Sequence, residues 1–174
     1  MRVMGLEASR FLAKKARVKG LDVVIGDIQA ASFCGGSLDA ISMWDVIEHL
    51  PRPLDALKEN HRILSAGGIL ILSTPNAGSI LHSLSLWMYR LEDHLLGRPA
   101  RRVFGGHPLY FSGPSLRRLL TRSGFRVRAS WQHGVASEMS FTGGFIEKGA
   151  RIIDGSLGRI LRRRYRMVVI AQKV

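Results

Sequence analysis

Short apolar runs alternate with helical stretches through the first 76 of the 174 residues in this chain. The run at 69–72 is apolar on both faces, which is typical of a central parallel strand covered by helices on both sides. Strands are expected at 2–6, 21–25, 38–44 and 69–72, and helices at 8–17 and 51–64. In the first helix, Phe11 and Leu12 are expected to face the core. This alternation predicts an α/β fold with an open, mostly parallel sheet.

The second part of the chain departs from this rhythm. Residues 125–131 alternate in polarity, which predicts a half-exposed strand near the sheet edge. One face of that strand is expected to carry Phe125, Val127, Ala129 and Trp131. The remaining elements are expected to be helices at 79–96, 114–123 and, weakly, 150–161, followed by a final strand at 167–171.

Length and composition narrow the class of protein. The length suits one domain with one sizeable core. The single cysteine, Cys34, excludes a disulfide framework within the chain and favours a reduced, cytoplasmic setting; nothing near it suggests a role. No apolar run reaches 18 residues, and the first ten residues lack the apolar stretch of a secretory signal, so neither a transmembrane helix nor a signal peptide is expected.

Positive charge is concentrated after Leu96. The net charge is +13, and the first 96 residues carry ten basic and ten acidic side chains, against sixteen and three in the remainder. Such a field attracts phosphates, nucleic acid or an anionic membrane surface, although a solvated basic surface is an equally good interpretation.

Polar residues follow the expected strands, where an open parallel sheet binds its ligands. Glu7 follows the first run, and a carboxylate there can accept both hydroxyl groups of a ribose. Asp27 follows the second run and can accept a hydrogen bond from an adenine amino group, with Ile28 against the ring. The alternative for either carboxylate is a helix cap.

Several segments, taken together, resemble the class I S-adenosylmethionine-dependent methyltransferases, and most of all the ubiquinone-biosynthesis O-methyltransferase-like group. The segments that carry the resemblance are 5–9, 26–28, 38–50, 62–76 and 106–112. The resemblance implies S-adenosylmethionine as the cofactor, with Glu7 on the ribose and Asp27 and Ile28 on the adenine. By the same resemblance, Trp44 and Asp45 line the cleft beside the methionine portion.

The resemblance also implies a Rossmann-like three-layer sandwich in a single domain, 1–174. Within it, 1–76 would form the cofactor side, 77–112 a lid and 113–174 the substrate side. One feature of the family is missing, because no G-x-G motif precedes Glu7. The chain starts at what corresponds to the family's second strand, so the first strand and helix are expected to be absent from a truncated domain. Such a chain is expected to bind the cofactor poorly, and a non-catalytic remnant of the fold is the alternative.

Methyl transfer by this family is an in-line displacement in which the protein aligns the reactants and supplies a base. His49 and His107 are the candidate bases, because imidazole titrates near neutrality. Each has an alternative interpretation without a catalytic role. His49 could bond backbone at the start of a helix, and His107 could be a solvated residue of a loop. Asp45, Glu48 and His49 have the ligand types of a divalent metal site, but helix capping explains them as well, and no metal is expected.

The acceptor is expected to be a small molecule or a lipid-linked one. The amphipathic stretch and the arginines in 79–102 could lie in a membrane interface, or could form a lid over the cleft. A nucleic-acid-binding module is a further alternative for so basic a chain. It is disfavoured, because the aromatic residues lie in amphipathic patterns rather than on a platform interleaved with arginines.

Overall fold

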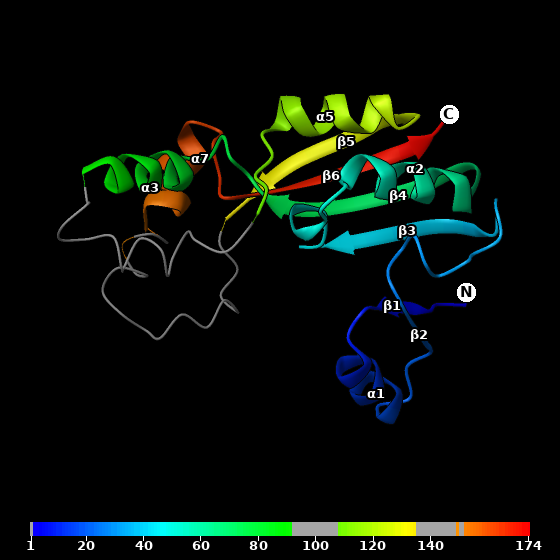
Figure 1. The fold of residues 1–174 in the computed structure, drawn as a ribbon. Coiled ribbons are helices and arrows are strands. Elements are labelled where there is room, and N and C mark those ends of the chain that lie inside the picture. The colour runs from blue at the N-terminus through cyan, green and yellow to red at the C-terminus, as the bar shows by residue number, and fades with distance from the viewer. Residues whose placement is uncertain (1, 92–107, 135–148, 150–151) are drawn as a thin grey trace.

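The computed structural model describes residues 2–91, 108–134, 149 and 152–174, drawn in colour in Figure 1. The chain begins with a small β-α-β unit. Strands β1 (Gly5–Glu7) and β2 (Val23–Ile25) pair in parallel, and helix α1 (Arg10–Val18) connects them. The N-terminus of α1 is capped by Ser9, whose side chain accepts a hydrogen bond from the backbone N–H of Leu12.

The main sheet has four strands in the order β3-β4-β6-β5. The strands are β3 (Leu38–Trp44), β4 (Leu64–Pro75), β5 (Phe125–His133) and β6 (Arg166–Lys173). Strand β4 is parallel to β3, whereas β6 runs antiparallel to both of its neighbours. Therefore β3, β4 and β5 end at the same edge of a mixed sheet, which we call the carboxyl edge. The expected Rossmann-like α/β class is confirmed.

Two amphipathic helices cover one face of this sheet, α2 (Pro53–Ile63) and α5 (Gly113–Arg122). Helix α5 begins with a capping box made by Ser112 and Ser115, and it buries Leu116 and Leu120 completely. The core between helices and sheet consists of Met43, Ile47, Leu57, Leu64, Leu70, Leu72, Phe111, Leu116, Leu120, Phe125, Met167, Val169 and Ala171.

Three further elements lie at the carboxyl edge or beyond it. They are the single-turn helix η1 (Ile47–His49), α3 (Ile80–Leu91) and α7 (Leu157–Ile160). In Figure 1, α3 and α7 lie side by side beyond the end of the sheet. The expected lid, 77–112, falls partly outside the described residues, so the division of the chain into three parts remains a prediction.

The prediction that Phe11 and Leu12 face the core is wrong. Their side chains are 65% and 50% exposed, whereas the neighbouring Ala13 is fully buried. The reason is that, among the described elements, α1 packs mainly against the two short strands β1 and β2, on the side of the helix that carries Ala13.

The predicted face of β5 is also wrong beyond Val127. The register with β6 shifts between Val127 and Ala129, so one extra residue is inserted into β5 as a bulge. Because side chains alternate along a strand, this insertion moves Ala129 and Trp131 to the face away from α5. Ser130 and Gln132 take their place on the helix side.

Strands β1 and β3 each have only one paired neighbour, and no strand of the described part lies between the two sheets. The face of the main sheet away from α2 and α5 carries Trp44 and Trp131, which are 58% and 47% exposed. A sheet with parallel strands normally has both faces covered. This part of the chain therefore has an open strand edge and an open apolar face.

Replacing Leu120 with alanine tests the packing of α5 on the sheet. Leu120 is fully buried in the core, so Leu120→Ala is expected to lower the free energy of unfolding by about 3 kcal/mol, measured by urea denaturation. Leu12→Ala is the matched control, since its side chain is half exposed, and it should cost about 0.5 kcal/mol or less. Equal losses for the two variants would contradict this assignment of the core.

Candidate active site at the carboxyl edge

Asp45 follows the last residue of β3 and links two distant parts of the chain. Its backbone has φ of 54°, a left-handed conformation that aspartate tolerates better than most residues, and its N–H donates to the Ser73 carbonyl. Both carboxylate oxygens accept hydrogen bonds from Nη1 of Arg166, at 2.6 and 2.8 Å. Arg166 is the first residue of β6, so this ion pair ties the end of β3 across β4 to the start of β6.

Glu48 is a fully buried carboxylate beneath the same edge. Its Oε2 accepts a hydrogen bond from the Thr74 hydroxyl at 2.9 Å, and its backbone carbonyl accepts one from the N–H of Leu109. Its second oxygen, Oε1, makes no hydrogen bond to the described residues. Glu48 therefore holds η1 against β4, and its Oε1 is buried.

Asn76, the polar residue directly after β4, is a turn former. Its Oδ1 accepts from the N–H of Gly78, and its Nδ2 donates to the Arg164 carbonyl. Its backbone N–H donates to the Tyr165 carbonyl at 2.7 Å. Asn76 thus joins the end of β4 to the segment that leads into β6.

Three further ring side chains gather near this edge. The rings of His82, on α3, and Tyr110 have centroids 4.6 Å apart. Burial lowers the pKa of His82, because desolvation disfavours the charged imidazolium. Burial also raises the pKa of Tyr165 above that of an ordinary tyrosine. Both groups are therefore neutral at pH 7.

The side chains of Glu7 and Asp27, the two carboxylates expected on the cofactor side, both accept hydrogen bonds from nearby backbone N–H groups. Glu7 ends β1, and its Oε1 accepts from the N–H of Ser9 at 2.8 Å. Asp27 follows β2 by two residues, and its Oδ1 accepts from the N–H groups of Gln29 and Ala30. Neither carboxylate is the N-cap of a helix, because Ser9 caps α1 and Asp27 closes a turn. The second oxygen of each makes no hydrogen bond to the described residues. The ends of β1 and β2 are adjacent, because Glu7 pairs with Ile25 and its carbonyl accepts from the N–H of Gly26.

The other predicted site residues are partly exposed or lie outside the described residues. Ile28 is half-buried after β2, Trp44 lies on the open face of the sheet, and His49 is exposed at the end of η1. His107 lies outside the described residues. Within the described part, no three side chains of the types that bind metals gather in one place, so the structure offers nothing in support of a metal at Asp45, Glu48 and His49.

Sequence reasoning missed Arg166 and the pair of His82 and Tyr110. Arg166 lies 121 residues from Asp45, and one arginine among many carries no signal of its partner. The contact of His82 with Tyr110 likewise depends on where α3 lies relative to the segment before α5.

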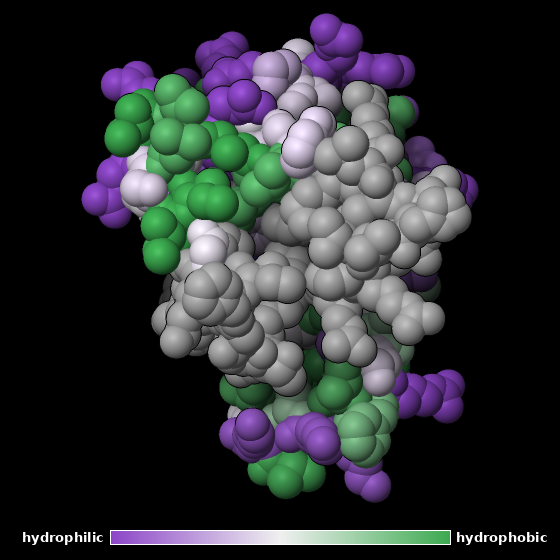
Figure 2. All heavy atoms as spheres, turned by 90° about the vertical axis from the view of Figure 1, so that its left-hand side faces the viewer, coloured by the Kyte–Doolittle hydropathy of each residue, from purple (hydrophilic) through white to green (hydrophobic). Residues whose placement is uncertain are grey.

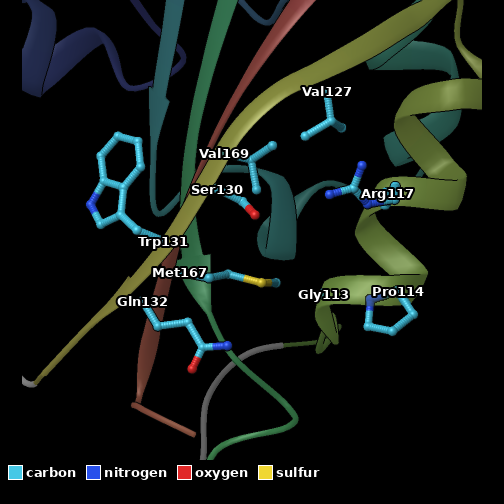
Figure 3. A pocket seen from close by; sticks show the side chains of 9 residues that line it. All are labelled: Gly113, Pro114, Arg117, Val127, Ser130, Trp131, Gln132, Met167 and Val169. Carbon is cyan, nitrogen blue, oxygen red and sulfur yellow. The ribbon is translucent and has the colours of Figure 1, made fainter. Parts of the chain in front are cut away.

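A cavity of about 370 Å³ lies between α5 and the strands β5 and β6 (Figure 3). Val127, Met167 and Val169 form its apolar floor. Figure 3 shows Ser130 and Gln132 pointing into it from β5, Arg117 reaching it from α5, and Trp131 turned to the other side of the strand. The bulge in β5 thus makes this end of the cavity polar. The cavity opens near the carboxyl edge, since Gln132 and Met167 are one residue from the ends of their strands.

Residues 3–130 match the model of the methyltransferase domain family. The chain belongs to this family. The match includes β1 to β4, α5 and most of β5, and so contains every predicted site residue. The cofactor expected of the family is S-adenosylmethionine.

Solved structures of low sequence identity share the fold. A SAM-dependent methyltransferase from Thermotoga maritima is 23% identical, with a TM-score of 0.67 over 98% of this chain and 72% of that one. A SAM-dependent methyltransferase from Archaeoglobus fulgidus is 21% identical, with a TM-score of 0.62 over 98% and 75%. The cyclase SpnF is 17% identical, with a TM-score of 0.63 over 99% and 66%. The fold therefore does not determine the reaction.

Among curated proteins, an uncharacterized 37.1 kDa protein in transposon TN4556 of Streptomyces fradiae is 31% identical over 84 residues. That alignment covers 45% of this chain and 24% of the relative. The matched part thus spans about a quarter of the relative's length.

A double-mutant cycle tests the ion pair at the carboxyl edge. Asp45→Asn keeps a residue that tolerates the left-handed backbone and removes the charge facing Arg166. With Arg166→Gln as the second change, we expect a coupling energy of about 1 kcal/mol in the free energy of unfolding.

The matched control is the cycle for Arg2 and Asp22, whose side chains are 84% and 55% exposed. No measurable coupling is expected there, because solvent screens the pair. Equal coupling in both cycles would show that the Asp45–Arg166 bond contributes no more than an ordinary surface ion pair.

Proposed function

We propose that this domain transfers a methyl group from S-adenosylmethionine to an oxygen of a small-molecule acceptor. The family match over residues 3–130 carries the proposal. It is supported by the carboxylates at the ends of two adjacent parallel strands, Glu7 and Asp27. Parallel sheets bind nucleoside cofactors beyond such strand ends.

The residues present fit the adenosine end of the cofactor. The backbone hydrogen bond to Oε1 of Glu7 holds that carboxylate in place, and Oε2 remains to accept the ribose hydroxyls. Asp27 is held in the same way through Oδ1, so Oδ2 remains for the adenine amino group, with Ile28 beside the ring. The exposed ring of Trp44 would flank the methionine portion.

S-Adenosylmethionine supplies a sulfonium methyl group that an acceptor oxygen can attack. Within this chain, His49 is the described candidate to take the hydroxyl proton on an imidazole nitrogen, because it is exposed at the end of η1. Asp45 is a positioning residue, since both of its carboxylate oxygens are bonded to Arg166. Their ion pair would fix the turn that carries His49.

The cavity beneath α5 is the proposed site for the part of the acceptor that does not react. Its floor of Val127, Met167 and Val169 suits an aromatic ring, and the Arg117 guanidinium suits a carboxylate. A phenolic acid, of the kind that the resemblance to ubiquinone-biosynthesis O-methyltransferases implies, combines these two features.

A non-catalytic remnant of the fold is the second candidate. The open edges of β1 and β3 and the exposed ring of Trp44 favour it, because a strand and a helix packed there would complete the sheet. In this case the chain would fold but would not bind the cofactor.

Calorimetric titration with S-adenosylhomocysteine distinguishes the two candidates. The proposed function predicts saturable heat, and Glu7→Gln is expected to weaken binding about tenfold, because an amide is a poorer acceptor for two hydroxyls. Asp22→Asn is the matched control, since this carboxylate is exposed in the same β-α-β unit, and binding should stay unchanged. No heat from a folded chain would support the remnant.

The acceptor site is tested with 3,4-dihydroxybenzoate as the probe. We expect its binding to shift the backbone amide signals of Ser130 and Gln132 in NMR spectra, and Ser130→Trp to abolish the shifts by filling the cavity. Ala129→Trp is the matched control, because the bulge places this side chain on the opposite face of β5. If Ala129→Trp abolishes binding equally, or the wild-type signals do not move, the acceptor site lies elsewhere.

A further inference from the structure

An exposed apolar surface extends over α3 and α7, at the end of the molecule beyond the carboxyl edge. It consists of Leu86, Trp87, Leu157, Ile160 and Leu161, and we call it the α3–α7 surface. Ile160 is 75% exposed and Trp87 59%, values unusual for such large apolar side chains. Figure 2, which views the molecule from this end, shows hydrophobic side chains gathered there beside hydrophilic ones.

Hydrogen bonds join α3 to the segment that directly follows α7. The Arg163 guanidinium donates from Nε to the Gly78 carbonyl at 2.7 Å and from Nη2 to the Ser83 hydroxyl at 3.0 Å. The Arg163 carbonyl accepts from the N–H of Ile80, the first residue of α3. These hydrogen bonds thus hold the two helices that carry the apolar side chains next to each other.

Arginines border the apolar side chains. Arg159 lies within α7, and Arg162 follows it, and both are exposed. The acidic residue of this segment, Asp154, is buried, and its Oδ1 accepts from the N–H of Tyr165. Within residues 152–166 as the structure describes them, no acidic side chain is exposed, so the border carries a net positive charge.

We propose that the α3–α7 surface docks on an anionic lipid bilayer. Leucine, isoleucine and tryptophan side chains enter the boundary between headgroups and acyl chains, and the bordering arginines pair with lipid phosphates. A second copy of the chain fits less well, because a two-fold contact would bring the arginines of both copies together. Nucleic acid would leave the apolar side chains in water. No helix of the described part is long and apolar enough to span a bilayer, so docking would be on the surface.

Co-sedimentation with vesicles tests the proposal. The full chain is expected to sediment with vesicles of phosphatidylglycerol and phosphatidylcholine in equal parts and to remain in solution with phosphatidylcholine alone. Ile160→Glu and Leu161→Glu should each weaken binding about tenfold, because a carboxylate would enter the apolar boundary. Arg162→Glu should weaken it about fivefold or more and reduce its dependence on salt.

Two controls separate docking from a general effect of acidic substitutions. Phe11→Glu places a carboxylate on α1, where the native side chain is 65% exposed and lies outside the α3–α7 surface, and binding should stay unchanged. Arg122→Glu makes the same charge change at the end of α5 and should have a much smaller effect than Arg162→Glu. Circular dichroism confirms that each variant is folded.

Three results would overturn the proposal. The first is that the chain binds both kinds of vesicle equally well, and the second is that the Ile160→Glu variant binds vesicles as tightly as the native chain does. The third is that the native chain is a dimer which Ile160→Glu dissociates, while neither form binds vesicles. Sedimentation equilibrium without vesicles detects the third result. None of these measurements depends on cofactor binding, so the proposal can fail while the methyltransferase function stands.

Discussion

Strand β4 is the element on which the rest of the described structure depends. It pairs with β3 on one edge and β6 on the other, and its leucines form the centre of the core beneath α2 and α5. At its end, Thr74 bonds the buried Glu48, and Asn76 bonds the segment leading into β6. Both the sheet and the carboxyl edge are therefore built around one strand, which is why the apolar run at 69–72 was so informative.

One face of the main sheet is covered by helices, and the opposite face is exposed. The face beneath α2 and α5 is closely packed, whereas Trp44 and Trp131 lie exposed on the opposite face, and β1 and β3 offer unpaired edges. Unpaired edges and exposed aromatic rings are costly in water unless something covers them. This asymmetry separates the packed face of the sheet from the face on which Trp44 and Trp131 are exposed.

Positive charge has two different roles in the C-terminal part of the chain. At the carboxyl edge, Arg166 is used inside the fold, where it neutralises Asp45 and fixes the turn after β3. On α7 and beyond it, the arginines face solvent beside apolar side chains. The basic residues in excess after Leu96 thus supply both an ion pair within the fold and a positively charged exposed surface.

The sequence by itself determined the α/β class and the approximate position of most helices and strands, because apolar periodicity is a local signal. The family followed from a resemblance that several segments carry together, and the family match agrees with it. Only the tertiary structure decided which faces are covered. The bulge in β5 moved Trp131 away from α5, the small β1–β2 pair left Phe11 exposed, and Arg166 found Asp45 across 121 residues. These outcomes depend on register and on distant neighbours, which periodicity along one segment does not contain.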